Sequence, residues 1–150
     1  MRQNLDALTN AFFKASRLTD LIFQINKGLS GQHAEARTRD METALHPVCL
    51  DAAGLVLMGS SQPCKYVGVQ GKEPDREAGQ KSKRAVSQAM QLIRELTPNS
   101  GSYANEADFF LEDWQELLWG SHYPRLLSVK QKYDPDNFFT VHHGVGSEAG

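Results

Sequence analysis

The spacing of hydrophobic positions predicts a helix and then a strand at the start of the chain. Residues 4–16 place apolar side chains three and four positions apart, which is the pattern of an amphipathic helix. Residues 21–26 change to a period of two, typical of a strand with one fully apolar face. The polar, alanine-rich segment 32–45 is expected to form a short helix.

A second strand is predicted at residues 51–58. This run is apolar on both faces and ends in Gly59, two serines and Pro63, which favours a buried central strand over a helix. Residues 66–69 are expected to form a third short strand.

The clearest helix follows Asp75, which is expected to cap it, and Pro98 is expected to end it. Two more helices are predicted near 112–119 and 122–133. The second carries a stripe formed by Tyr123, Leu126, Leu127 and Lys130. Because strands and helices do not alternate regularly, the predicted fold class is α+β: one domain over 1–150, with a small antiparallel sheet and helices packed on one face.

Composition excludes several classes of protein. The chain has 150 residues and a formal charge of -2, and its pI of 6.2 argues against a nucleic-acid partner. No apolar run approaches the roughly 20 residues that span a bilayer, so no membrane partner is expected. The N-terminal residues lack the apolar core of a secretory signal, and we therefore expect a cytoplasmic protein.

Short motifs elsewhere in the chain do not predict other chemistry. The glycines at 144 and 146 have no helix after them, so they do not form a dinucleotide fingerprint. His142 and His143 are adjacent on a segment expected to be extended, where their side chains would point opposite ways, and no metal site is predicted. Cys49 and Cys64 are expected to be free thiols.

Two pairs of polar residues are candidate site residues. Tyr103 and Asn105 are two positions apart in a glycine-rich connection, so both can point into one cavity if the segment is extended. Gln24 and Asn26 share one face of the strand at 21–26, where they bind substrate or face water. Both alternatives stay open for the second pair.

Three motifs near the C-terminus together resemble one family. They are SYANEAD at 102–108, WGSHYPRLL at 119–127 and KYDPDNFF at 132–139. They are similar to the C-terminal end of FAD-linked oxidases of the berberine-bridge-enzyme type, and the closing HGVGSE resembles fungal members. Upstream, FQINKGLSG at 23–31 and TALHPVCLDAAGLVLM at 43–58 are similar to the substrate domain of the same enzymes.

The resemblance implies one half of a flavin enzyme of fungal secondary metabolism, without its FAD-binding domain. Tyr103 and Asn105 match a Tyr-x-Asn motif that approaches flavin and substrate, and Asn137 matches a position near the cofactor. His46 stands where the family more often has asparagine, and it joins Tyr103 as a catalytic candidate. FAD is expected to bind only with a partner FAD-binding domain, and not tightly to this chain alone.

Three functions follow from this interpretation. The first is the substrate half of an FAD-linked oxidoreductase acting on a small molecule. The second is a flavin-free isomerase or cyclase in which Tyr103 or His46 moves a proton. The third is a non-catalytic partner protein. In each case the strand at 51–58 would leave an apolar sheet face exposed, which predicts a homodimer or a partner domain.

Overall fold

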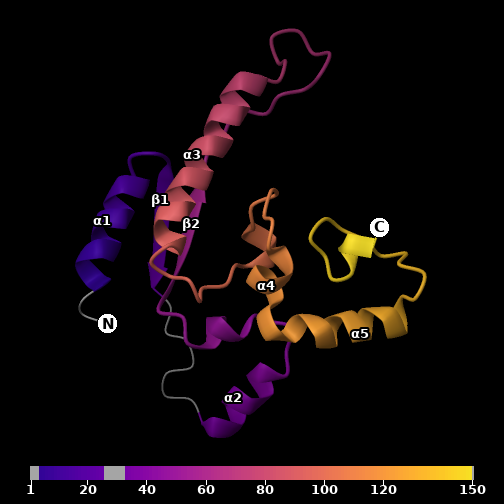
Figure 1. Ribbon diagram of the computed structural model, residues 1–150. Helices are drawn as coiled ribbons and strands as arrows, with labels where there is room; N and C mark the ends of the chain where they lie inside the picture. Colours follow the sequence, from indigo (N-terminus) through magenta and orange to yellow (C-terminus); the bar gives the residue numbers. More distant parts are fainter. Residues whose placement is uncertain (1–3, 26–32, 150) are drawn as a thin grey trace. The chain divides into compact units, whose positions relative to one another are not determined.

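The computed structural model describes residues 4–25 and 33–149 (Figure 1). The chain forms two compact units, the first from residues up to 24 and 55–98, the second from residues 25–54 and 99–150. The single domain predicted over 1–150 stays a prediction, because compact contact units need not be folding units.

The first unit contains two helices and most of a strand pair. Its elements are α1 (Leu5–Ala15), β1 (Asp20–Ile25), β2 (Gly54–Gly59) and α3 (Arg76–Arg94). The two strands pair antiparallel, and the Thr19 hydroxyl before β1 donates a 2.7 Å hydrogen bond to the carbonyl of Gly59 at the end of β2. The predicted α+β class is therefore confirmed.

The core of the first unit is built from small side chains. Ala11 and Ala15 of α1 are buried against Ala89 and Ile93 of α3, so the two helix backbones approach each other closely. Partly buried hydrophobic side chains surround this cluster; they are Phe12, Leu21, Met58, Leu92 and Leu96. Because Leu21 and Met58 come from the two strands, the helices pack on one face of the sheet, as predicted.

The N-terminus of α3 also follows the prediction. Asp75 has an extended backbone, and its carboxylate accepts a 2.9 Å hydrogen bond from the N–H of Ala78. This is the geometry of an N-cap, which satisfies one of the free N–H groups of the first turn. The helix ends at Arg94, before Pro98.

The second unit is built from short helices and turns. Its α-helices are α2 (Ala34–Met41), α4 (Trp114–Trp119) and α5 (Tyr123–Tyr133), and its 3-10 helices are η2 (Pro47–Leu50), η3 (Ala104–Glu106), η4 (Gly120–His122) and η5 (Ser147–Ala149). Leu111, Trp114 and Leu118 form its buried cluster. The stripe predicted on α5 is confirmed, because Tyr123, Leu126, Leu127 and Lys130 are half-buried while the rest of the helix is exposed.

Two predicted strands need correction. Residues 66–69 are not a strand but part of an exposed turn, in which the N–H of Tyr66 donates to the carbonyl of Lys72 at 2.7 Å. Gly68 and Gly71 have φ angles of 81° and 76° there, in a region that favours glycine. The segment predicted as a buried central strand is β2, which is only half-buried and pairs with β1 alone among the described residues.

No helix in the described parts of the chain is long and apolar enough to cross a membrane.

Candidate functional site

His46 lies at the start of η2 with both ring nitrogens engaged. Its Nδ1 accepts a 3.1 Å hydrogen bond from the backbone N–H of Val48, so Nδ1 carries no proton. The proton of the neutral ring is therefore on Nε2, which donates to the carbonyl oxygen of Glu116 at 3.1 Å. Burial lowers the pKa of His46, partly opposed by the hydrogen bond to Glu116.

Two glycines make room for this ring. A Cβ atom on Gly101 would lie 2.8 Å from Cγ of His46, and one on Gly120 would lie 2.7 Å from its Nε2. Gly120 also has φ 52° and ψ -138°, a conformation that side-chain-bearing residues rarely adopt. The imidazole is thus packed between the backbone before Tyr103 and the junction of α4 with η4.

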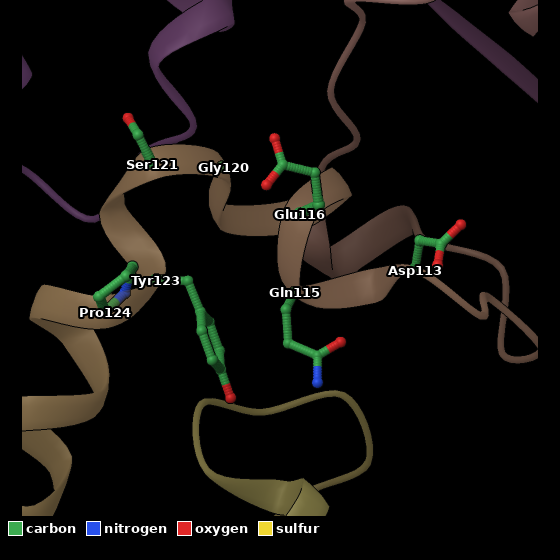
Figure 2. Close-up of a pocket in the computed structure, with 7 residues that line it drawn as sticks. All are labelled: Asp113, Gln115, Glu116, Gly120, Ser121, Tyr123 and Pro124. Carbon is green, nitrogen blue, oxygen red and sulfur yellow. The ribbon is translucent and has the colours of Figure 1, made fainter.

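A pocket of about 340 Å³ lies at that junction (Figure 2). It is lined by Asp113, Gln115, Glu116, Gly120, Ser121, Tyr123 and Pro124. Figure 2 shows the side chains of Gln115 and Tyr123 extending in the same direction, toward the loop of the C-terminal segment. Of the lining residues, only Gly120 is buried, so the pocket is shallow.

The Tyr123 hydroxyl is tied to the C-terminal segment. It donates to Oε1 of Glu148 at 2.5 Å and accepts from the N–H of Gly146 at 3.2 Å. Burial and the hydrogen bond to the Glu148 carboxylate raise the pKa of Tyr123. This hydroxyl therefore holds the C-terminal turn against α5 rather than serving as a ready proton acceptor.

Tyr103 and Asn105 contact each other, although residues 104–106 form the 3-10 helix η3 rather than the extended segment that the prediction assumed. The Asn105 amide donates to the Tyr103 hydroxyl at 2.7 Å. Tyr103 is 45% exposed, and neither residue lines the pocket. The loop that carries them is held to α4 because the N–H of Ser102 donates to the carbonyl of Leu117 at 2.6 Å.

Asn137 is half-buried in the turn after α5. Its φ of 53° is left-handed, and its N–H donates to the carbonyl of Asp134 at 3.1 Å. The same turn is held by Asp134. Its carboxylate accepts hydrogen bonds from the N–H groups of Phe138 and Phe139 and forms an ion pair with Lys130. The hydrogen bond from Lys130 is the main reason that the pKa of Asp134 is lowered. The network fixes a turn that leaves Phe138 82% and Phe139 76% exposed.

Two residues of the first predicted strand, Gln24 and Asn26, were expected to bind substrate or to face water. Gln24 is exposed on β1, and Asn26 lies outside the described residues. Their role stays a prediction, as do the catalytic and cofactor roles assigned to His46, Tyr103, Asn105 and Asn137.

The prediction that the side chains of His142 and His143 point opposite ways is wrong. Their ring centroids are 3.8 Å apart, because His143 has a left-handed φ of 58° and the strand-like alternation of side chains is lost. His142 stacks on Phe109 at 4.1 Å, and His143 stacks on Trp114 at 5.6 Å. Burial, followed by the proximity of His142, lowers the pKa of His143.

The pocket and the ring stack were not found from the sequence. The signal for the pocket was Gly120 between Trp119 and Ser121, a glycine inside an otherwise helical stretch. Trp119 Nε1 and His122 Nδ1, on either side of that glycine, are buried without a hydrogen-bond partner among the described residues.

The described residues fit a flavin cofactor only in part. A phenol hydroxyl and an amide side by side can contact the polar edge of a flavin ring. However, the N-terminus of α3, the longest helix described, is already capped by the Asp75 carboxylate, so it does not offer a site for a pyrophosphate. Contact between this chain and FAD therefore stays a prediction.

Comparisons with known proteins agree with the motifs. Residues 102–146 match the family described as berberine and berberine like. The FAD-linked oxidoreductase notD of an Aspergillus species is 39% identical over 125 residues, which make up 79% of this chain and 18% of notD. The FAD-linked oxidoreductase ffsJ of Aspergillus flavipes is 46% identical over 65 residues, or 43% of this chain and 11% of ffsJ.

The fold agrees with the same family. The crystal structure of the VAO-type flavoprotein MtVAO713 from Myceliophthora thermophila matches with a TM-score of 0.72 and 25% identity, over 95% of this chain and 25% of that protein. The match at residues 102–146 and these relatives confirm the family resemblance that the motifs indicated. The chain spans less than a fifth of the length of these two curated relatives.

Proposed function

We propose that the chain supplies the substrate side of an FAD-linked oxidoreductase and acts together with an FAD-bearing segment. The observation that carries this proposal is the Tyr103–Asn105 pair, which is held on a fixed loop inside the berberine-like match at 102–146. The flavin, when bound, would accept a hydride from the substrate. This chain's residues would bind and orient that substrate.

The hydrogen bond within the pair gives the phenol a defined task. Because Asn105 donates to the Tyr103 oxygen, the Tyr103 hydroxyl is left to donate its own proton in another direction. A substrate oxygen or nitrogen placed there would receive one oriented hydrogen bond.

Exposed apolar side chains support the second part of the proposal, a partner segment. On the part of β1 in the first unit, Ile22 and Phe23 are 57% and 50% exposed. In the second unit, Phe138 and Phe139 are exposed on the turn fixed by Asp134. We assign both patches to contacts with the FAD-bearing segment, because both curated relatives described above are FAD-linked and much longer than this chain.

A flavin-free isomerase is less well supported. His46 could carry a proton only after one of its two hydrogen bonds broke, since Val48 and Glu116 occupy both nitrogens. Tyr103 would then be the single proton carrier among the two predicted. A non-catalytic partner protein would need no exposed polar pair at all.

The test is to purify the chain alone and together with the part of notD that it does not match, and to measure flavin absorbance across a size-exclusion column. We expect the chain alone to elute without flavin, and the mixture to give a yellow complex. Replacing Phe138 and Phe139 by serine should prevent the complex without unfolding the chain, whereas Tyr66→Phe, on an exposed turn, is the control. A chain that elutes alone with bound FAD, or as a homodimer that ignores the notD segment, would contradict the proposal.

A further inference from the structure

One imidazole contacts three separate parts of the second unit. His46 caps η2 through Val48, donates to the Glu116 carbonyl in α4, and lies against the backbone of Gly101 and Gly120. Gly101 precedes the loop of Tyr103 and Asn105, and Gly120 is a wall of the pocket. The two candidate features, which share no residues, therefore meet at one side chain.

We propose that His46 is a positioning residue, which in its neutral form with the proton on Nε2 sets the loop of Tyr103 against the pocket at the α4–η4 junction. The geometric part of this inference stands on the second unit alone. The functional part, that this placement matters for substrate, rests on the proposed function.

Imidazole is suited to this task because it offers an acceptor and a donor on one rigid plane. The acceptor satisfies the N–H of Val48 at the start of η2, and the donor satisfies the Glu116 carbonyl next to the end of α4. Asparagine could replace the acceptor, since it is a good N-cap residue, but its shorter side chain cannot also reach Glu116. Alanine would replace neither contact and would leave the space between the two glycines empty.

Protonation should break this arrangement. A protonated Nδ1 would direct its own N–H at the N–H of Val48, so one of the contacts would be lost. The groups that face the ring from neighbouring elements are Glu116 of α4, whose charge favours protonation, and His122 of η4, whose charge opposes it. Burial dominates and lowers the pKa of His46. The stabilising contribution is therefore complete above the ordinary histidine pKa of about 6.5 and is lost as the pH falls through the lower pKa of the folded state.

The geometric part is tested by nitrogen NMR of the histidine rings in the intact chain. We expect His46 to show the tautomer with the proton on Nε2 and to titrate below the ordinary histidine value. The signals of Tyr103 and Gly120 should shift with the same midpoint. This shift should vanish in His46→Gln and persist in His33→Gln, a substitution at an exposed histidine outside the site. A proton on Nδ1, or signals of Tyr103 that ignore the His46 titration, would overturn the inference.

A pair of substitutions tests the packing independently. In Gly101→Ala the new methyl group would press on the His46 ring and on Cγ1 of Val48, which would lie 2.9 Å from the added carbon. We expect Gly101→Ala to lower the melting temperature of the wild-type chain by more than it lowers that of His46→Ala. If Gly101→Ala lowers the melting temperature equally in the wild-type chain and in His46→Ala, the His46 ring does not hold the loop of Tyr103.

The functional part needs the complex with the notD segment. We expect His46→Asn to retain the complex and its flavin but to change the flavin spectrum in the direction that Tyr103→Phe changes it, with a smaller shift. If the ring behaves as predicted by NMR and no complex forms, the proposed function fails while the positioning of Tyr103 stands. If the complex forms and His46→Asn leaves the spectrum as in the wild type, the functional part of this inference is wrong.

Discussion

The two units of the chain are stabilised in different ways. The first unit packs α1 against α3 through alanines, and its helices follow the hydrophobic pattern of the sequence. The second is held by aromatic rings and by hydrogen bonds from side chains to the backbone, such as those of His46 and Asp134. All five histidines lie in the second unit. The comparison shows a regular scaffold in one region and the chemistry-bearing groups in the other.

Backbone conformation separates the units in the same way. The two non-glycine residues with positive φ among those described, Asn137 and His143, are both in the second unit. Such residues persist where the surrounding structure fixes them, here by the Asp134 turn and the ring stack. The candidate site thus lies in the region where local preferences are overruled by longer-range contacts.

The largest effect should come from removing the central ring of the second unit. Trp114 is buried with Leu111 and Leu118 and contacts the rings of Tyr123 and His143. Trp114→Ala should reduce the free energy of unfolding by about 3–5 kcal/mol, because a large buried ring leaves a cavity. Urea denaturation measures this loss, and hydrogen exchange should place it in α4 and α5. An equal loss of protection in α1 and α3 would show that the two units do not differ as described.

The matching change in the first unit adds volume instead. Ala89 has no exposed surface and faces the alanines of α1. Ala89→Leu should destabilise the chain by about 1–3 kcal/mol, because the close helix contact has no room for three more carbons. Gln88→Leu, at an exposed position of the same helix, should change stability little. If both substitutions behave alike in urea, the α1–α3 contact is not the core of this unit.

A smaller effect is expected at the start of α3. Asp75→Ala removes the acceptor for the N–H of Ala78 and should cost about 1 kcal/mol of stability. Asp75→Ser keeps an acceptor at this position and should recover most of the loss. Thermal unfolding followed by circular dichroism measures both. If the alanine variant is as stable as the serine variant, the hydrogen bond from Ala78 to Asp75 does not stabilise the start of α3.

The sequence predicted the longer helices better than the turns and the burial of the strands, for a physical reason. Helices α1, α3 and α5 follow a repeating apolar pattern, and a local signal such as Asp75 marks where a helix begins. The turn at 66–72 was missed because two glycines with positive φ override the strand preference of its valines. A local pattern of residues predicts a helix or a strand only where the backbone φ and ψ angles take ordinary helical or extended values.

The candidate site was less predictable. The sequence paired Tyr103 with Asn105 by assuming an extended segment, whereas residues 104–106 form η3 and the two side chains meet through the hydrogen bond from the Asn105 amide. The contacts of His46 could not, because Gly101 and Gly120 are far along the chain, and only the folded second unit brings them to the ring. The close approach of the His142 and His143 rings likewise depended on one left-handed φ, which the residue types do not predict.

The most direct test of the central claim is the flavin absorbance spectrum of the complex between this chain and the remaining part of notD. If Tyr103 faces the flavin, Tyr103→Phe should shift the flavin bands while leaving the amount of bound flavin unchanged. Tyr66→Phe, the matched change on the exposed turn of the first unit, should leave the bands where they are. Bands that are identical in all three complexes would contradict the claim that this chain places Tyr103 beside the cofactor.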